Sequence, residues 1–112
     1  MGTIQKRKEH QALSLIERTE LGKLKFGVPH SFSVDLKNES EHNITITSLT
    51  PSCGACTTAR IDRSIILSGE TLKVHLIFTP GSTGNLVKAV NIYYELNGRS
   101  HSTHIKFAAN VS

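Results

Sequence analysis

Apolar and polar residues alternate with a period of two along much of this chain. The clearest run is 71–79, in which every second position is apolar: Leu72, Val74, Leu76 and Phe78. Successive side chains of a β-strand point to opposite faces, so this pattern buries one face of a strand and leaves the other in water. The same alternation recurs within 30–38, 85–96 and 100–111. Half-buried strands of this kind are typical of antiparallel sheets.

Turn-forming residues separate the alternating runs. Asn97-Gly98 stands between two of them and predicts a tight hairpin. We expect strands near 12–17, 20–26, 30–38, 43–50, 57–62, 70–79, 85–96 and 100–111. Several short strands without a convincing helix predict an all-β fold, an immunoglobulin-like antiparallel β-sandwich of about seven to eight strands.

A chain of 112 residues fits one domain, and its charge is unevenly placed. Of the formal net charge of +4, the first ten residues supply +2, from Lys6, Arg7 and Lys8 against Glu9. We therefore predict a basic N-terminal arm at 1–11 and a sandwich domain at 12–112. The arm residues expected to contact partners are Thr3, Ile4, Gln5, Lys6, Arg7 and Lys8. The alternative is a solvated tail.

Apolar runs are too short for export or membrane insertion. The basic start is followed only by the run 12–16, whereas a signal peptide needs a longer apolar segment and a cleavage site. No stretch approaches the length of a membrane span. We expect a protein that is not secreted by a signal peptide and has no membrane partner.

Cys53 and Cys56 form a C-x-x-C motif with three interpretations. A thioredoxin-like redox site needs this motif at a helix N-terminus, but here it lies between expected strands. A zinc site needs about four ligands, of which two cysteines supply half. The third interpretation is a structural pair, either free thiols or a local disulfide. We favour the structural pair and keep Cys53 and Cys56 as weaker metal or redox candidates.

Motifs for catalysis or nucleic-acid binding are missing from the sequence. It has no Gly-x-Ser-x-Gly elbow and no glycine-rich phosphate loop. His101 and His104 are three apart on an expected strand and so point to opposite faces. Tyr93 and Tyr94 face opposite ways too, which disfavours a base-stacking platform. We predict no enzyme activity, no catalytic residues, no cofactor, no small-molecule substrate and no nucleic-acid partner.

Several segments, taken in order, resemble a known family. They are LGKLKFG at 21–27, FSVDLKN at 32–38, ITIT at 44–47, PSCG at 51–54, CTTA at 56–59, LSGE at 67–70, VHLIFTP at 74–80 and TG at 83–84. This order resembles the bacterial and phage Ig-like domain family of unknown function whose hallmark is Pro-Ser-Cys-Gly-Cys-Thr. That family is similar to Hydin-type and major-sperm-protein sandwiches. The resemblance spans roughly 20–110 and implies a mostly structural or scaffolding role; the inserted Ala55 departs from the hallmark.

The function expected from the sequence is that of a non-enzymatic structural protein, an Ig-like module of a larger assembly. The first setting is a phage virion, as capsid decoration or cement, neck or tail protein, assembled in the host cytoplasm. Its partners are then further copies of itself or capsid and tail proteins. The alternative is a cytoplasmic protein-binding or scaffolding module of a cellular host. A weaker alternative is a redox or metal-binding protein that uses the C-x-x-C motif.

Overall fold

The computed structural model describes residues 12–14 and 18–112, and these residues form strands and no helix. The strands are β1 Leu13–Ser14, β2 Thr19–Leu24, β3 His30–Asn38, β4 Ile44–Pro51, β5 Thr57–Ile61, β6 Ile65–Ile66, β7 Thr71–Phe78, β8 Gly84–Leu96 and β9 Arg99–Val111. No membrane-spanning helix occurs in this part of the chain.

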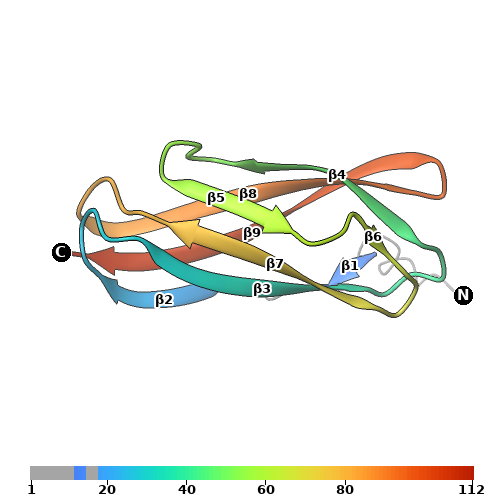
Figure 1. Cartoon of the computed structure of the whole chain (residues 1–112), viewed down its shortest axis with the longest axis horizontal. Helices are drawn as coiled ribbons and strands as arrows, with labels where there is room; N and C mark the ends of the chain where they lie inside the picture. Colours follow the sequence, from blue (N-terminus) through green and yellow to red (C-terminus); the bar gives the residue numbers. More distant parts are fainter. Residues whose placement is uncertain (1–11, 15–17) are drawn as a thin grey trace, which may run out of the picture.

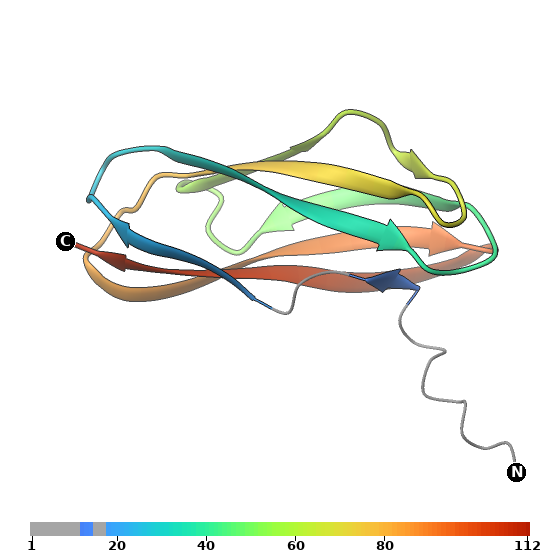
Figure 2. The same ribbon diagram turned by 90° about the horizontal axis from the view of Figure 1, so that it is seen from below.

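The strands form two stacked sheets, as predicted for a sandwich. One sheet has four strands in the order β1-β3-β7-β5, and the other has five in the order β2-β9-β8-β4-β6. Figure 1 shows the two sheets viewed down the shortest axis of the molecule, and Figure 2 shows them turned by 90° about the horizontal axis. The strands run along the long axis of the molecule, whose extents are 51 × 32 × 19 Å. Loops therefore gather at two opposite ends.

The core lies between the sheets and follows the alternation seen in the sequence. On β7, the four apolar alternates are at most 3% exposed, while Ile77 on the other face is 44% exposed. Phe32 and Phe78 from one sheet both pack edge-on against Phe107 from the other, with ring centroids 5.2 Å apart in each pair. These aromatic contacts join the two layers across the core.

The structure confirms the expected sandwich and adds two details to it. The sandwich is not wholly antiparallel, because β2 pairs in parallel with β9. No hairpin links these strands, which lie near opposite ends of the chain, so connection length does not impose an antiparallel direction. The strand count is nine rather than seven to eight, because β6 has only two residues and is too short for an alternation to mark it.

The predicted tight hairpin is confirmed. Asn97 has a φ of 53° and Gly98 a φ of 80°, the pair of left-handed residues that a type I′ turn requires. This turn joins β8 to β9, two strands of 13 residues each that pair over their whole length. The hairpin tip lies at the same end of the sandwich as the β3–β4 loop (Figure 1).

Candidate functional site

Strand β5 forms an open edge of the four-stranded sheet. It pairs with β7 on one side and with no described strand on the other. The Thr79 amide donates to the carbonyl oxygen of Cys56 at 2.8 Å. Cys56 and Thr79 are therefore the first hydrogen-bonded residue pair of the ladder between β5 and β7. Such pairs alternate in antiparallel sheets, so Thr58 also bonds toward β7. The backbone groups of Ala59 and Ile61 consequently point to the open edge.

Apolar side chains stand partly exposed beside this edge. Ala59 and Ile61 of β5 and Leu49 of β4 pack against the core but are only half-buried. β4 and β5 contact each other across the two layers. An additional strand beside β5 would cover these side chains and pair with the outward backbone groups. The edge therefore offers both hydrogen-bonding and apolar contacts.

The outer face of β5 borders a hollow of about 460 Å³. Its lining residues are Ser31, Phe32, Ser33, Thr58, Arg60, His75, Leu76 and Ile77. At its rim, the Asp62 carboxylate lies 2.8 Å from Arg60 and 3.3 Å from His75. The hydrogen bond with His75, followed by that with Arg60, lowers the pKa of Asp62 from its ordinary value. These side chains are exposed and paired, so their interactions contribute little to stability.

The loop before β5 contains the cysteine pair. Cys53 and Cys56 are joined by a disulfide. The Cys56 and Thr57 amides both donate to the Cys53 carbonyl, at 3.2 and 3.0 Å, and form a tight turn. The disulfide thus holds the loop that leads into β5. A second hollow, of about 390 Å³, separates this loop from 79–82 and is also lined by Lys88.

The described residues contain no cluster of three or more His, Cys, Asp or Glu side chains that could hold a metal ion. His101 pairs with buried Tyr94 and His104 with exposed Asn91, so the two histidines face opposite ways as predicted. His101 stacks on Tyr94 with ring centroids 5.3 Å apart. Burial raises the pKa of Tyr94. Tyr93 lies on the other face and is 42% exposed.

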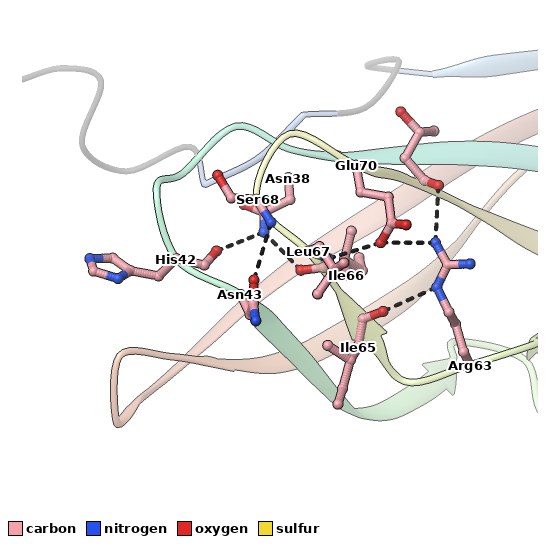
Figure 3. A network of polar contacts seen from close by, with 10 residues as sticks. Asn38, His42, Asn43, Arg63, Ile65, Ile66, Leu67, Ser68 and Glu70 are labelled. Carbon is pink, nitrogen blue, oxygen red and sulfur yellow. Dashed lines mark hydrogen bonds and ion pairs between the residues drawn. The ribbon is translucent and has the colours of Figure 1, made fainter.

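Asn38 forms a polar network that sequence reasoning missed (Figure 3). Its side chain is fully buried. Nδ2 donates to the carbonyls of His42 at 2.8 Å and Ile66 at 2.9 Å, and Oδ1 accepts from the amide and hydroxyl of Ser40 at 2.9 and 2.7 Å. All its hydrogen-bonding groups are therefore used within the fold. The available signal was the Asn-x-Ser spacing, which favours an Asx turn.

The predicted arm lies outside the described residues. Thr3, Ile4, Gln5, Lys6, Arg7 and Lys8 all fall within 1–11. Their contact role and the division at residue 11 stay predictions.

The fold is similar to several solved structures. The Vibrio cholerae VesB protease matches with a TM-score of 0.77 and 18% identity, over 92% of this chain and 33% of that one. The C. elegans MSP family member WR4 matches with a TM-score of 0.65 and 10% identity, over 90% of this chain and 98% of that one. A PapD-like domain of human CEP192 matches with a TM-score of 0.62 and 10% identity, over 90% of this chain and 85% of that one. The chain thus spans about a third of the VesB protease, and identities this low show the fold alone.

A comparison with curated proteins gives no match. A family model does match, over residues 16–111, and its description is a protein of unknown function, DUF1573. The match covers all the described strands except β1. The chain therefore belongs to the DUF1573 family.

Proposed function

We propose that this chain is a non-enzymatic protein-binding module that accepts an extended segment of a partner protein beside β5. The observation that carries the proposal is the open edge at Ala59 and Ile61. Backbone groups along such an edge have no partner strand in the described structure. A partner segment would extend the sheet and satisfy them.

The surroundings of β5 specify the chemistry of the segment. Its inward side chains would lie over Leu49, Ala59 and Ile61, which are apolar and half-buried. Its outward side chains would lie beside Thr58 and Arg60, which are exposed. A segment that alternates apolar and polar residues fits both faces.

The length of β5 limits the affinity. With five residues, the strand offers only a few outward backbone groups. Each new hydrogen bond contributes roughly 0.5–1.5 kcal/mol net, and the buried apolar contacts add to this. We therefore propose a reversible contact that gains strength from repetition or from a second attachment point.

The arm at 1–11 is our proposed second attachment point, which makes the module part of a larger assembly. The phage-virion setting and its capsid, neck or tail partners stay proposals that the family and the similar structures do not support. The same edge would serve a scaffolding module in the cytoplasm of a cellular host. The two settings share the binding mechanism and differ in the partner.

A short peptide of alternating valine and threonine tests the edge directly. We expect its addition to shift the amide resonances of Ala59 and Ile61. Ala59→Pro removes one outward N–H at an edge position where proline is tolerated, and should weaken binding about tenfold. Thr45→Val is the control, because it changes an exposed side chain of β4 outside the β5 edge and should bind normally.

A second comparison separates loss of binding from loss of folding. The same peptide with N-methyl groups on one edge cannot form the backbone bonds, and should fail against the unaltered protein. Equal binding of the methylated peptide, or of the Ala59→Pro protein, would rule out strand addition at β5.

A further inference from the structure

Several exposed charges of the described residues are paired along the strands of the sandwich. The ion pairs there are Arg18–Glu20 at 2.6 Å, Arg60–Asp62 at 2.8 Å and Lys73–Asp35 at 3.0 Å. The opposite charges within each such pair largely cancel at a distance. The charges that make no ion pair with another described residue lie mainly toward the two ends.

One end carries a surface that we call the basic tip: Lys25, Phe26 and Val28, in the loop between β2 and β3. Phe26 is 55% exposed and Val28 50%. The loop is held in place because the Gly27 amide donates to the Pro80 carbonyl at 2.9 Å. Its apolar side chains are therefore presented by an anchored turn.

The charge at this end that forms no ion pair among the described residues has one sign, because Glu20 of β2 is paired with Arg18. The stretches 23–30, 50–58 and 77–90 surround the basic tip and contain no Asp or Glu. They contribute Lys23, Lys25 and Lys88, none of which forms an ion pair with a described residue. The Ser112 backbone carbonyl accepts from the Phe26 amide at 3.0 Å, which holds this loop beside the end of β9.

The other end of β3 carries a surface of opposite character, which we call the acidic tip. It consists of Glu39, Glu41, Ile65 and Leu67. Ile65 is 47% exposed and Leu67 50%, and both glutamates are exposed. The Ser68 hydroxyl donates to the Ser40 carbonyl at 2.6 Å, which ties the two contributing loops together. Figure 3 shows Leu67 and Ile65 beside the polar network that includes Asn38 and Ser68.

Near the acidic tip, acidic groups exceed basic ones among the described side chains that make no ion pair with another described residue. Glu39, Glu41 and Glu95 make no ion pair with a described residue, against Lys37 and Arg99 on the adjoining strands. Glu70 is neutralised by Arg63 at 3.1 Å.

We infer that the basic tip of one copy binds the acidic tip of the next, so that the chain associates head to tail. Each tip combines exposed apolar side chains with charges that make no ion pair among the described residues, and the charges of the two tips are opposite. Because the tips lie at opposite ends of one molecule, the contact is heterologous and leaves a free tip at each end of any array. The inference goes beyond the proposed function and does not use the β5 edge.

The size of the ends makes this contact weak. The two shorter extents, 32 and 19 Å, bound the contact at roughly 600 Å² per copy, below the ~800 Å² typical of stable complexes. Association should therefore be reversible, rise with protein concentration and fall with salt, which screens the charges.

Charge reversal at each tip tests the inference by sedimentation velocity at low salt. Lys25→Glu and the double variant Glu39→Lys/Glu41→Lys should each remain monomeric at concentrations where the unaltered protein associates. Mixed in equal amounts, they should associate again, because each then meets a complementary tip. The matched control is Lys106→Glu, which makes the same charge change as Lys25→Glu on the exposed face of β9, outside both tips.

Three outcomes would overturn the inference. They are an unaltered protein that stays monomeric at every concentration, a Lys25→Glu protein that associates normally, and a mixture that shows no recovery. A monomeric protein whose basic tip instead binds a polyglutamate peptide or anionic vesicles would assign that tip to another partner. Ala59→Pro should leave the association unchanged, so the β5 proposal and this one can fail separately.

Discussion

The two ends of the sandwich are closed by different chemistry. At one end, the buried amide of Asn38 makes four hydrogen bonds to the β3–β4 loop and to Ile66. At the other, backbone hydrogen bonds such as Gly27 to Pro80 and the disulfide of Cys53 and Cys56 hold the loops. One end thus adds a buried side chain to its backbone hydrogen bonds, whereas the other adds a local disulfide to its own.

This difference indicates which end of the molecule tolerates substitutions better. A buried amide must keep all its partners, because each group left unpaired carries a desolvation penalty. A local covalent link restricts only the few residues inside it. The disulfide end, next to which β5 begins, is therefore the end that can accept a partner or a substitution more readily.

The largest effect is expected at the Asn38 end. Asn38→Ala leaves the Ile66 carbonyl without its side-chain donor in the interior, and should lower the free energy of unfolding by about 3 kcal/mol. Urea denaturation measures this loss. Asn85→Ala is the control: it removes an exposed 2.6 Å bond with Asn110 and should change stability by less than about 0.5 kcal/mol. Equal losses would erase the distinction between buried and exposed amides.

The disulfide should contribute less than Asn38. Replacing both cysteines by serine opens a loop with a sequence separation of three and should cost about 2 kcal/mol. A reducing agent should destabilise the unaltered protein equally and leave the double variant unchanged in the same urea experiment. A loss larger than that of Asn38→Ala would reverse the comparison.

Glycines in left-handed turns should behave alike at both ends. Gly27 has a φ of +76° and Gly98 a φ of +80°, and each has open space where a Cβ would lie. Substitution of either by alanine should cost about 1 kcal/mol, from backbone strain alone. Thermal denaturation of the two variants checks this. Unequal shifts would mean that tertiary contacts at one end add to the local cost.

The smallest effect is expected between the ends, at Asp62. The hydrogen bonds from His75 and Arg60 lower the pKa of this carboxyl in the folded protein below its ordinary value of 3.8. Its contribution to stability is therefore present above pH 3.8 and is lost as the pH falls through the lower folded pKa. Asp62→Asn should flatten stability against pH in this acid range. An unchanged slope would show that the pairing does not influence folding.

The sequence predicts the sandwich well because burial of alternate side chains is a local pattern. The runs that contain Val74, Phe107 and Tyr94 indicated the correct buried faces. The parallel pairing of β2 with β9 could not be predicted, since strand partners distant in the chain are selected by packing and not by a turn.

The candidate surfaces were harder to predict. The open edge follows from sheet order, which periodicity does not encode. Glu39 and Lys25 are visible as charges in the sequence, but only the course of β3 between their loops places them at opposite ends. Asn38 lies at the end of an expected strand, and its burial depends on Ile66, far along the chain.

Amide hydrogen exchange, resolved by residue, is the sharpest test of the open edge and of the contrast between the two ends. The open edge predicts that Ala59 and Ile61 exchange quickly while their neighbours Thr58 and Arg60 exchange slowly. At the Asn38 end, the Asn38 amide, which donates to the Glu70 carbonyl at 2.9 Å, should be strongly protected. Uniform protection along β5 would contradict the open edge. Rapid exchange at Asn38 would contradict the contrast between the two ends.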